Sequence, residues 1–498
     1  MVKKINISNI IYGLILVFYY FYISYYASNP FDDAFIHMRI SRNFAELGLP
    51  YFNINDPVMG SSSHTWILLL STLFSIFGAK IKIVLLLQFV VFSTLFYFLR
   101  KLLSHKFSKL ASTLLSVLLI HVTLNQSVLG LMESSLLCLF FTLYLTYRIK
   151  ENVLVSSVFL SLCVFTRNEF SILWVINLIF MYKNKEFWKG SILVFFSFFI
   201  YLFYFYGTII PSPYLAKKFL YDGYGVGIKS LSFLVNNHTP YYICNEVLKE
   251  STCFYDRFGN LTLLILVTFC VGLFSLFYLK LGKNKQIYRE VLIFCLILFL
   301  LYLFSEVYLS FWYWPNILFP LGLILLLNLA LSRSHIIGLI FIPKIILSLM
   351  PIYGFIVRDK TNYFLHYFNS RIQVYEKIAN FINSEKGDFI KSPVLLTQEL
   401  GVLGWKYRGE VKCAFGLVSS DTFKIIKANS DQFDSSFKAI FEIIEQVQPD
   451  YYIYFIGGPK DEELNLKMAK LNYDAVRKFK LTHDILDRSE IILYQKNK

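Results

Sequence analysis

Long apolar stretches separated by short polar segments dominate the first two-thirds of the chain. Apolar runs recur from Ile10 to about Ile356, and a helix needs roughly 20 such residues to cross a bilayer. Lys and Arg cluster in alternate polar segments, as at 100–109 and 280–289. This pattern predicts an α-helical polytopic membrane protein with about 11 transmembrane helices.

The charged segments also predict the orientation of these helices. Basic loops are retained in the cytoplasm, so the segments between the basic clusters are expected on the outer side. Two of these outer segments are long, at residues 28–80 and 208–260. The outer segments carry the acidic residues Asp32, Asp33, Asp56, Glu133 and Glu169.

The pattern changes near residue 358, where charged residues become frequent and long apolar runs stop. We therefore divide the chain into a transmembrane region, residues 1–357, and a soluble α/β domain outside the membrane, residues 358–498. In the second region, helical periodicity covers 371–383 and 435–447, and short strands are expected at 394–397, 451–455 and 491–494. In the first, amphipathic stretches at 34–47 and 65–77 are expected to lie along the membrane surface.

Composition excludes several other classes. With 56% hydrophobic and 16% charged residues among 498, the chain is too apolar for a soluble fold of this length. Its net charge of +15 is spread over loops, which favours a topology signal over nucleic-acid binding. Cys244 and Cys253 share an outer loop and form a candidate disulfide. His64 and His238 lack a partner at metal-binding spacing, which favours solvated or hydrogen-bonded histidines over metal ligands. A divalent metal as cofactor is left open.

The first outer loop holds the strongest candidate chemistry. Asp32 and Asp33 follow a predicted span directly, where carboxylates are costly unless they are solvated or functional. One of them also suits the N-cap of a helix, which is the structural alternative. A carboxylate near an apolar wall and a cation can be tuned as a general base. His37, Arg39 and Arg42 follow within a few helical turns, so carboxylates and cations are expected to converge on one patch.

Further charged residues on the same side are candidates for substrate binding. They are Glu133, Arg167, Glu169, Lys217 and Lys218. Each alone is weak, since charges flank the spans of any membrane protein. Together with the first loop, they suit a reaction in which a hydroxyl loses a proton while an anionic phosphate leaves.

These residues resemble the GT-C glycosyltransferases that use polyprenyl-phosphate sugars, in particular bacterial terminal β-arabinofuranosyltransferases and related lipopolysaccharide-biosynthesis proteins. The similarity rests on Asp32-Asp33-Ala-Phe-Ile, with Arg39, Asn43, Gly48, Asn53, Gly60-Ser-Ser and Trp66 following in order. It continues through Gly130-Leu-Met-Glu133, Arg167-Asn-Glu169, Pro211 with Lys217, and Gln398-Glu-Leu-Gly401 with Gly404 and Gly416-Leu417. One departure is Trp312-Tyr313 before Pro315, where many relatives have an Arg-Tyr pair.

The resemblance implies a carboxylate base at Asp32 or Asp33 and an inverting transfer on the periplasmic or extracellular face of the bacterial cytoplasmic membrane. The donor would be a polyprenyl-phosphate sugar, and the acceptor would be a cell-envelope polysaccharide or glycolipid. Membrane lipid would surround the helices. A lipid-linked glycan polymerase or ligase using a diphosphate donor is the alternative within this class. A lipid or solute transporter is the alternative outside it, although the sequence shows no internal repeat.

Overall fold

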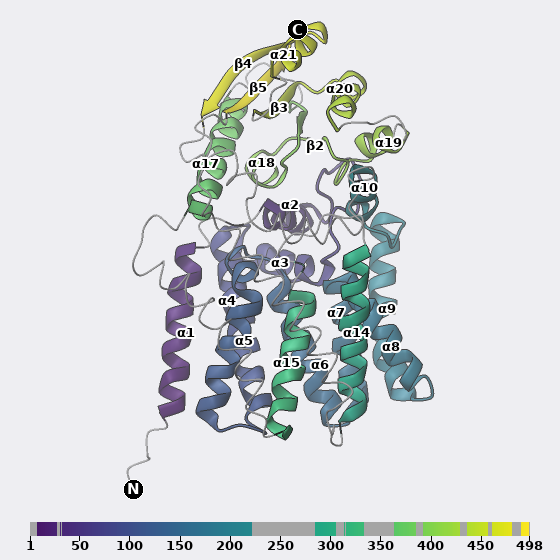
Figure 1. Cartoon of the computed structure of the whole chain (residues 1–498). Helices are drawn as coiled ribbons and strands as arrows, with labels where there is room; N and C mark the ends of the chain where they lie inside the picture. The colour runs from purple at the N-terminus through teal and green to yellow at the C-terminus, as the bar shows by residue number, and fades with distance from the viewer. Residues whose placement is uncertain are drawn as a thin grey trace.

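A computed structural model of the chain describes residues 7–26, 30, 32–221, 284–304, 313, 315–332, 363–384, 392–428, 436–456, 461–480 and 490–497. Most of these residues are helical, and the apolar helices lie side by side as a bundle (Figure 1). The helices of the bundle are α1 (Ile7–Tyr26), α4 (Ile81–Leu103), α5 (Lys109–Leu129), α6 (Ser134–Ile149), α7 (Val153–Thr166), α8 (Ser171–Met181), α9 (Lys185–Tyr206), α14 (Lys285–Phe304) and α15 (Pro315–Ser332).

Local signals set the helix ends. The Asn152 side chain accepts a hydrogen bond from the backbone N–H of Val155 and caps α7, and Asn184 caps α9 in the same way. Helix α9 ends at Gly207, whose φ of 64° is readily adopted only by a residue without a Cβ. The helix breaks fall in the polar segments that the sequence marks as turns.

The bundle has the composition of a multi-pass membrane protein. In the described residues, Ile7–Tyr25, Ile81–Leu103 and Lys185–Tyr206 are long and apolar enough to cross a membrane, and six shorter apolar helices accompany them. Helices α1 and α9 expose large side chains, including Leu14, Phe21 and Ile192, which suits contact with lipid. The total of about 11 spans stays a prediction.

Three further helices lie at one end of the bundle: α2 (Asp32–Leu47), α3 (His64–Phe77) and α10 (Ser212–Tyr221). Helices α2 and α3 run across the bundle rather than along it (Figure 1). The two amphipathic helices expected at 34–47 and 65–77 are therefore confirmed as helices. The turns at 130–133 and 167–170 are at this same end, because successive bundle helices alternate in direction (Figure 1).

A small α/β unit stands on that end, which we call the C-terminal unit (residues 363–497). Its five-stranded sheet has the order β2-β1-β3-β5-β4, in which β1 pairs in parallel with β2 and β3, and β5 pairs antiparallel with β3 and β4. The strands are β1 (Leu395–Thr397), β2 (Val411–Cys413), β3 (Tyr451–Ile456), β4 (Tyr473–Lys480) and β5 (Glu490–Lys496). The helices are α17 (Tyr363–Ser384), α18 (Gly401–Lys406), α19 (Ser420–Ala428), α20 (Ser436–Val447) and α21 (Asp461–Lys470).

The two helices and three strands expected in this unit are confirmed, whereas β2 and β4 are not recognisable from sequence. Strand β2 has only three residues, too few for a period of two to show. Strand β4 is exposed at every position from Asp474 to Lys478, so it lacks the alternation that marks a half-buried strand.

The C-terminal unit shares its core with the bundle. Leu395, Val411 and Tyr451 of the sheet belong to the same buried cluster as Trp66 and Phe74 of α3. Residues on the opposite face of the sheet, such as Tyr452 and Ile492, form a separate cluster with α20 and α21. One face of the sheet is therefore continuous with the membrane region, which fixes the unit above α2 and α3.

Candidate functional site

Helix α2 presents two sets of polar residues. Asp32 and Arg39 are seven residues apart, two turns along one face, whereas Asp33 and His37 share a neighbouring face at a spacing of four. Asp32 and Arg39 both contact α18 of the C-terminal unit. His37 instead approaches Glu133 in the turn between α5 and α6. The two candidate bases therefore lie on different faces of α2: Asp32 is on the face that contacts α18, and Asp33 is on the face of His37, which approaches Glu133.

The Asp32 carboxylate holds the first turn of α18. Its Oδ1 atom accepts the backbone N–H groups of Gly401 at 2.9 Å and Val402 at 3.3 Å. A Cβ at Gly401 would overlap the Asp32 backbone carbonyl and carboxylate, so the approach requires glycine. The Oδ2 atom makes no hydrogen bond within the described part of the chain, which leaves one oxygen of a fixed carboxylate available.

Arg39 holds the other end of α18. The side chain is 3% exposed, and its guanidinium donates five hydrogen bonds, the full capacity of the group. The acceptors are the carbonyl oxygens of Phe52 (2.6 Å), Gly404 (2.9 Å), Gly409 (2.8 Å) and Tyr407 (3.2 Å), and Oδ1 of Asn53 (3.2 Å).

Arg42 adds to the same contact. It donates to the carbonyl of Trp405 at 2.7 Å, and its guanidinium stacks over the Trp405 ring at 4.9 Å. Helix α2 thus places a carboxylate at the N-terminus of α18 and two cations at its C-terminus, which complements the helix dipole at both ends.

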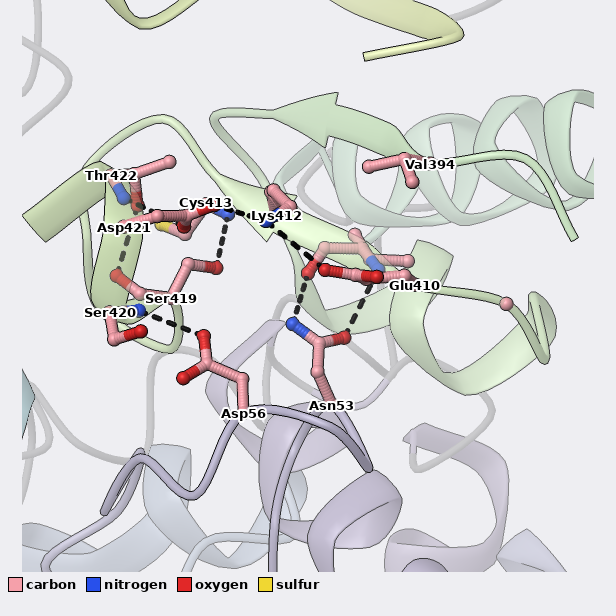
Figure 2. A network of polar contacts seen from close by, with 12 residues as sticks. Asn53, Asp56, Val394, Glu410, Lys412, Cys413, Ser419, Ser420, Asp421 and Thr422 are labelled. Atoms are coloured by element: carbon pink, nitrogen blue, oxygen red, sulfur yellow. Dashed lines mark hydrogen bonds and ion pairs between the residues drawn. The ribbon is translucent and has the colours of Figure 1, made fainter. Parts of the chain in front are cut away.

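The loop after α2 makes a second contact with the C-terminal unit, drawn in Figure 2. The Asn53 side chain accepts the N–H of Val411 at 3.1 Å and donates to its carbonyl at 2.9 Å, extending the edge of β2. Asp56 accepts the N–H of Ser420, the first residue of α19, at 2.8 Å. First-loop residues therefore pair with backbone groups more than 350 positions away in sequence.

The surroundings of Asp32 alter its proton affinity. Burial, and after it the charge of Glu399, raise the pKa of its carboxyl to about 7, although the Gly401 N–H lowers it in part. Glu399 is itself bound by the Arg371 guanidinium and by the Tyr375 hydroxyl at 2.7 Å, both from α17. Asp32 is therefore a carboxylate whose pKa lies in the range useful to a general base near neutrality.

A second cluster lies between the bundle helices at the same end. Arg167, after α7, donates to Glu133 at 2.9 Å and to Glu169 at 3.0 Å. Nδ1 of His37 is 3.7 Å from the second Glu133 oxygen. Burial opposes ionisation of Glu133, but His37 and Arg167 outweigh it and hold the pKa of this carboxyl below its ordinary value.

The cluster extends into α14 and α15. The Tyr302 hydroxyl donates to Glu169 at 3.3 Å and accepts from Nδ2 of Asn316 at 3.1 Å. The Arg167 guanidinium stacks over the Tyr313 ring at 4.4 Å. Several buried atoms here have no hydrogen-bond partner among the described residues: Nδ1 of His37, Oε2 of Glu133, Nε of Arg167 and Oδ1 of Asn316. Both donors and acceptors are thus left for water or a polar ligand.

The structure brings together most of the predicted site residues, in two groups. Asp32, Arg39 and Arg42 meet the C-terminal unit. His37, Glu133, Arg167 and Glu169 form the second cluster, and Asp33 begins the face of α2 that leads to it. Lys217 and Lys218 belong to α10, but their side chains lie outside the described part of the chain.

Other sequence candidates have simpler outcomes. His64 is buried and packs against Tyr201 and Tyr206, and burial lowers its pKa to about 3, so its ring is neutral. The described residues contain no group of three or more His, Cys, Asp or Glu side chains that could hold a metal. Cys244, Cys253 and His238 lie outside the described residues.

Sequence reasoning did not single out Tyr302, Asn316, Arg371, Tyr375 or Glu399. The first two lie within apolar helices, where a lone polar residue gives little signal. Glu399 belongs to the Gln398-Glu-Leu-Gly401 stretch that the resemblance marked, and this was the available clue.

Comparison with known proteins gives no family. No family model matches the chain, and no curated protein matches its sequence. Among solved structures, ArnT from Cupriavidus metallidurans bound to undecaprenyl phosphate is 11% identical over 97% of each chain, with a TM-score of 0.49. The apo form of ArnT is 11% identical over 92% of this chain and 93% of its own, with a TM-score of 0.35. Likeness at this level assigns neither fold nor activity.

Proposed function

We propose that the chain is a membrane glycosyltransferase that moves a sugar from a polyprenyl-phosphate donor to a cell-envelope glycan or lipid acceptor on the non-cytoplasmic face. The observation that carries this proposal is the Asp32 carboxylate at the end of the bundle that contacts the C-terminal unit. One oxygen is fixed by two backbone N–H groups, the other is available, and the pKa is about 7. The order of motifs shared with GT-C enzymes supplies the reaction class.

In the proposed reaction, Oδ2 of Asp32 takes the proton of an acceptor hydroxyl as that oxygen attacks the anomeric carbon of the donor sugar. The new glycosidic C–O bond forms on the face opposite the leaving group. The bond between the anomeric carbon and the phosphate oxygen breaks, and polyprenyl phosphate leaves with the bonding electrons. The anomeric configuration is inverted, and the proton stays on Asp32 until solvent removes it.

The cations of the site take different roles in this proposal. Arg39 has no donor left for a phosphate, so it positions α18 instead. Arg42 is bonded to the same helix through the carbonyls of Trp405 and Gly404. Lys217 and Lys218 remain the proposed phosphate-binding cations. They belong to α10, whose first residue, Ser212, donates to the carbonyl of Leu417 in the C-terminal unit at 2.7 Å.

The second cluster would bind the polar part of a substrate. Arg167 is held between two carboxylates, so the cluster offers hydrogen bonds without net positive charge. A sugar hydroxyl can both donate and accept, as His37, Glu133 and Asn316 require. Asp33, on the same side of α2 as His37, is proposed to contact substrate here.

The test compares Asp32→Asn with Asp33→Asn in purified full-length protein, assayed against a panel of polyprenyl-phosphate pentoses and hexoses. General acid–base catalysis contributes about 10²–10⁴-fold, so Asp32→Asn should lower transfer by at least about 100-fold. Asp33→Asn should raise KM with a smaller loss of kcat. Full activity in Asp32→Asn would refute the assignment of the base. Release of lipid diphosphate instead of monophosphate would indicate a polymerase or ligase.

A further inference from the structure

Glu399 occupies an unusual position for a carboxylate. It lies two residues before Gly401, whose backbone N–H is bonded to the Asp32 carboxylate, and its charge acts on Asp32. Two negative groups in a partly buried junction repel each other, so this arrangement must be stabilised from elsewhere. Nothing in the proposed transfer reaction requires Glu399 to touch a substrate.

The stabilising contacts come from α17. The Arg371 guanidinium binds one oxygen of Glu399, and the Tyr375 hydroxyl donates to the other at 2.7 Å. Arg371 and Tyr375 are four residues apart, so both project from one face of the helix. Helix α17 therefore holds Glu399 in a fixed orientation next to the turn that carries Gly401.

The remaining groups around Asp32 cannot replace this effect. Asp33 is its neighbour on α2, and the charge of Asp32 in turn raises the pKa values of Tyr375 in α17 and Cys413 in β2. Among the described residues, Asp33 is the other carboxylate that raises the pKa of Asp32, and its effect is smaller than that of Glu399. Glu399 is thus the principal charged residue of the C-terminal unit that acts on Asp32.

We propose that Glu399 is a positioning residue for Asp32, through which the C-terminal unit places a fixed negative charge beside the base across the α2–α18 junction. The role of this charge in catalysis rests on the proposed function, whereas its effect on the Asp32 carboxyl does not. With Glu399 in place, Asp32 holds a proton more tightly, and its conjugate base is correspondingly stronger. A loop far away in sequence thereby sets the strength of the proposed base.

The test measures the Asp32 carboxyl directly and needs no substrate. Infrared difference spectra of the full-length protein in detergent, recorded across pH, show the C=O stretch of protonated carboxyls. The band that Asp32→Asn removes belongs to Asp32. We expect its midpoint to fall by about 0.5 to 1 pH unit in Glu399→Gln, because a like charge is removed. We expect it to rise in Arg371→Gln, because the charge of Glu399 is then uncompensated.

The matched control is Glu46→Gln. Glu46 also crosses the junction, pairing with Arg408 at 2.6 Å, but that pair is exposed and is not among the charges that act on Asp32. Its variant should leave the Asp32 midpoint unchanged. If Glu399→Gln folds, as shown by the thermal unfolding transition, and leaves the midpoint where it was, the inference is wrong. This outcome is separate from the transfer assay, so either proposal can fail without the other.

Discussion

At the scale of single residues, the contact between α2 and α18 is most sensitive to substitution at Gly401. Gly401 has no room for a side chain, since a methyl group would overlap Asp32. We predict that Gly401→Ala displaces the carboxylate or the first turn of α18 and lowers transfer on the order of 100-fold, the usual effect of misplacing a catalytic group by about 1 Å. The measurement is kcat in the purified variant.

Gly13→Ala is the control for that substitution. Gly13 lies in α1 with nothing within 4 Å of an added Cβ, so alanine there should leave activity unchanged and favour the helix slightly. Equal activity in both variants would show that the close approach at Gly401 is not needed.

The buried pair of Arg167 and Glu133 gives a second residue-scale prediction. The side chains are 6% and 1% exposed, so Arg167→Gln leaves a charge buried without its main partner. We expect a loss of about 3–5 kcal/mol in stability, measured by thermal unfolding in detergent. The double variant Arg167→Gln with Glu133→Gln should recover part of this loss. A double variant that is less stable than the sum of the two single variants would contradict the pairing.

At this scale the sequence reveals charged residues that stand beside apolar segments, where such residues are unexpected. Asp32, Asp33 and Glu133 stand out because carboxylates beside apolar spans are rare. Their partners were harder to predict. Arg39 looks like a phosphate ligand until its five acceptors are known, and four of these are backbone carbonyls, which no side-chain motif records.

At the scale of elements, the α2–α18 contact depends on the geometry of guanidinium. We predict that Arg39→Lys, although it keeps the charge, destabilises the protein by several kcal/mol, because an ammonium has three donors on one atom and cannot reach acceptors on opposite sides. Limited proteolysis should then cut within the C-terminal unit at lower temperature than in the wild type.

Arg408→Gln is the comparison for this element. Its pair with Glu46 is exposed, and exposed pairs contribute about 0–1 kcal/mol. Its proteolysis temperature should match that of the wild type. If Arg39→Lys also matches, α18 is not held through Arg39.

Elements with strong periodicity were predictable, and short or exposed ones were not. The amphipathic helix at 34–47 and the strand at 451–455 carry their pattern within one segment. Strand β2 and helix α18 are short, and their place is set by tertiary contacts with Asn53 and Arg39. Local sequence could not determine elements whose hydrogen bonds lie more than 350 positions away.

At the scale of the whole molecule, charge predicts the orientation of the bundle. The end opposite the C-terminal unit carries Arg100, Lys101, Lys106 and Lys150 at helix ends, and the positive-inside rule predicts that this end faces the cytoplasm. We predict that Lys106→Cys, in a cysteine-free background, is labelled by an impermeant maleimide only after membranes are opened. Arg408→Cys should be labelled in cells whose cytoplasmic membrane is intact and whose outer envelope layers have been removed. The reverse pattern would invert the topology.

The span of the junction in sequence also bears on how the protein is made. Arg39 leaves the ribosome hundreds of residues before Gly404, its acceptor 365 positions later. During that interval a guanidinium destined for a buried site must be kept hydrated at the membrane surface, and loop closure over such a distance is slow. The contacts of Asp32 and Arg39 with the C-terminal unit therefore form only after residues 401–409 have been made and have reached the same side. A chain that ends before α18 would lack the backbone groups that bind Asp32 and Arg39, so the proposed activity would appear only once α18 has been made.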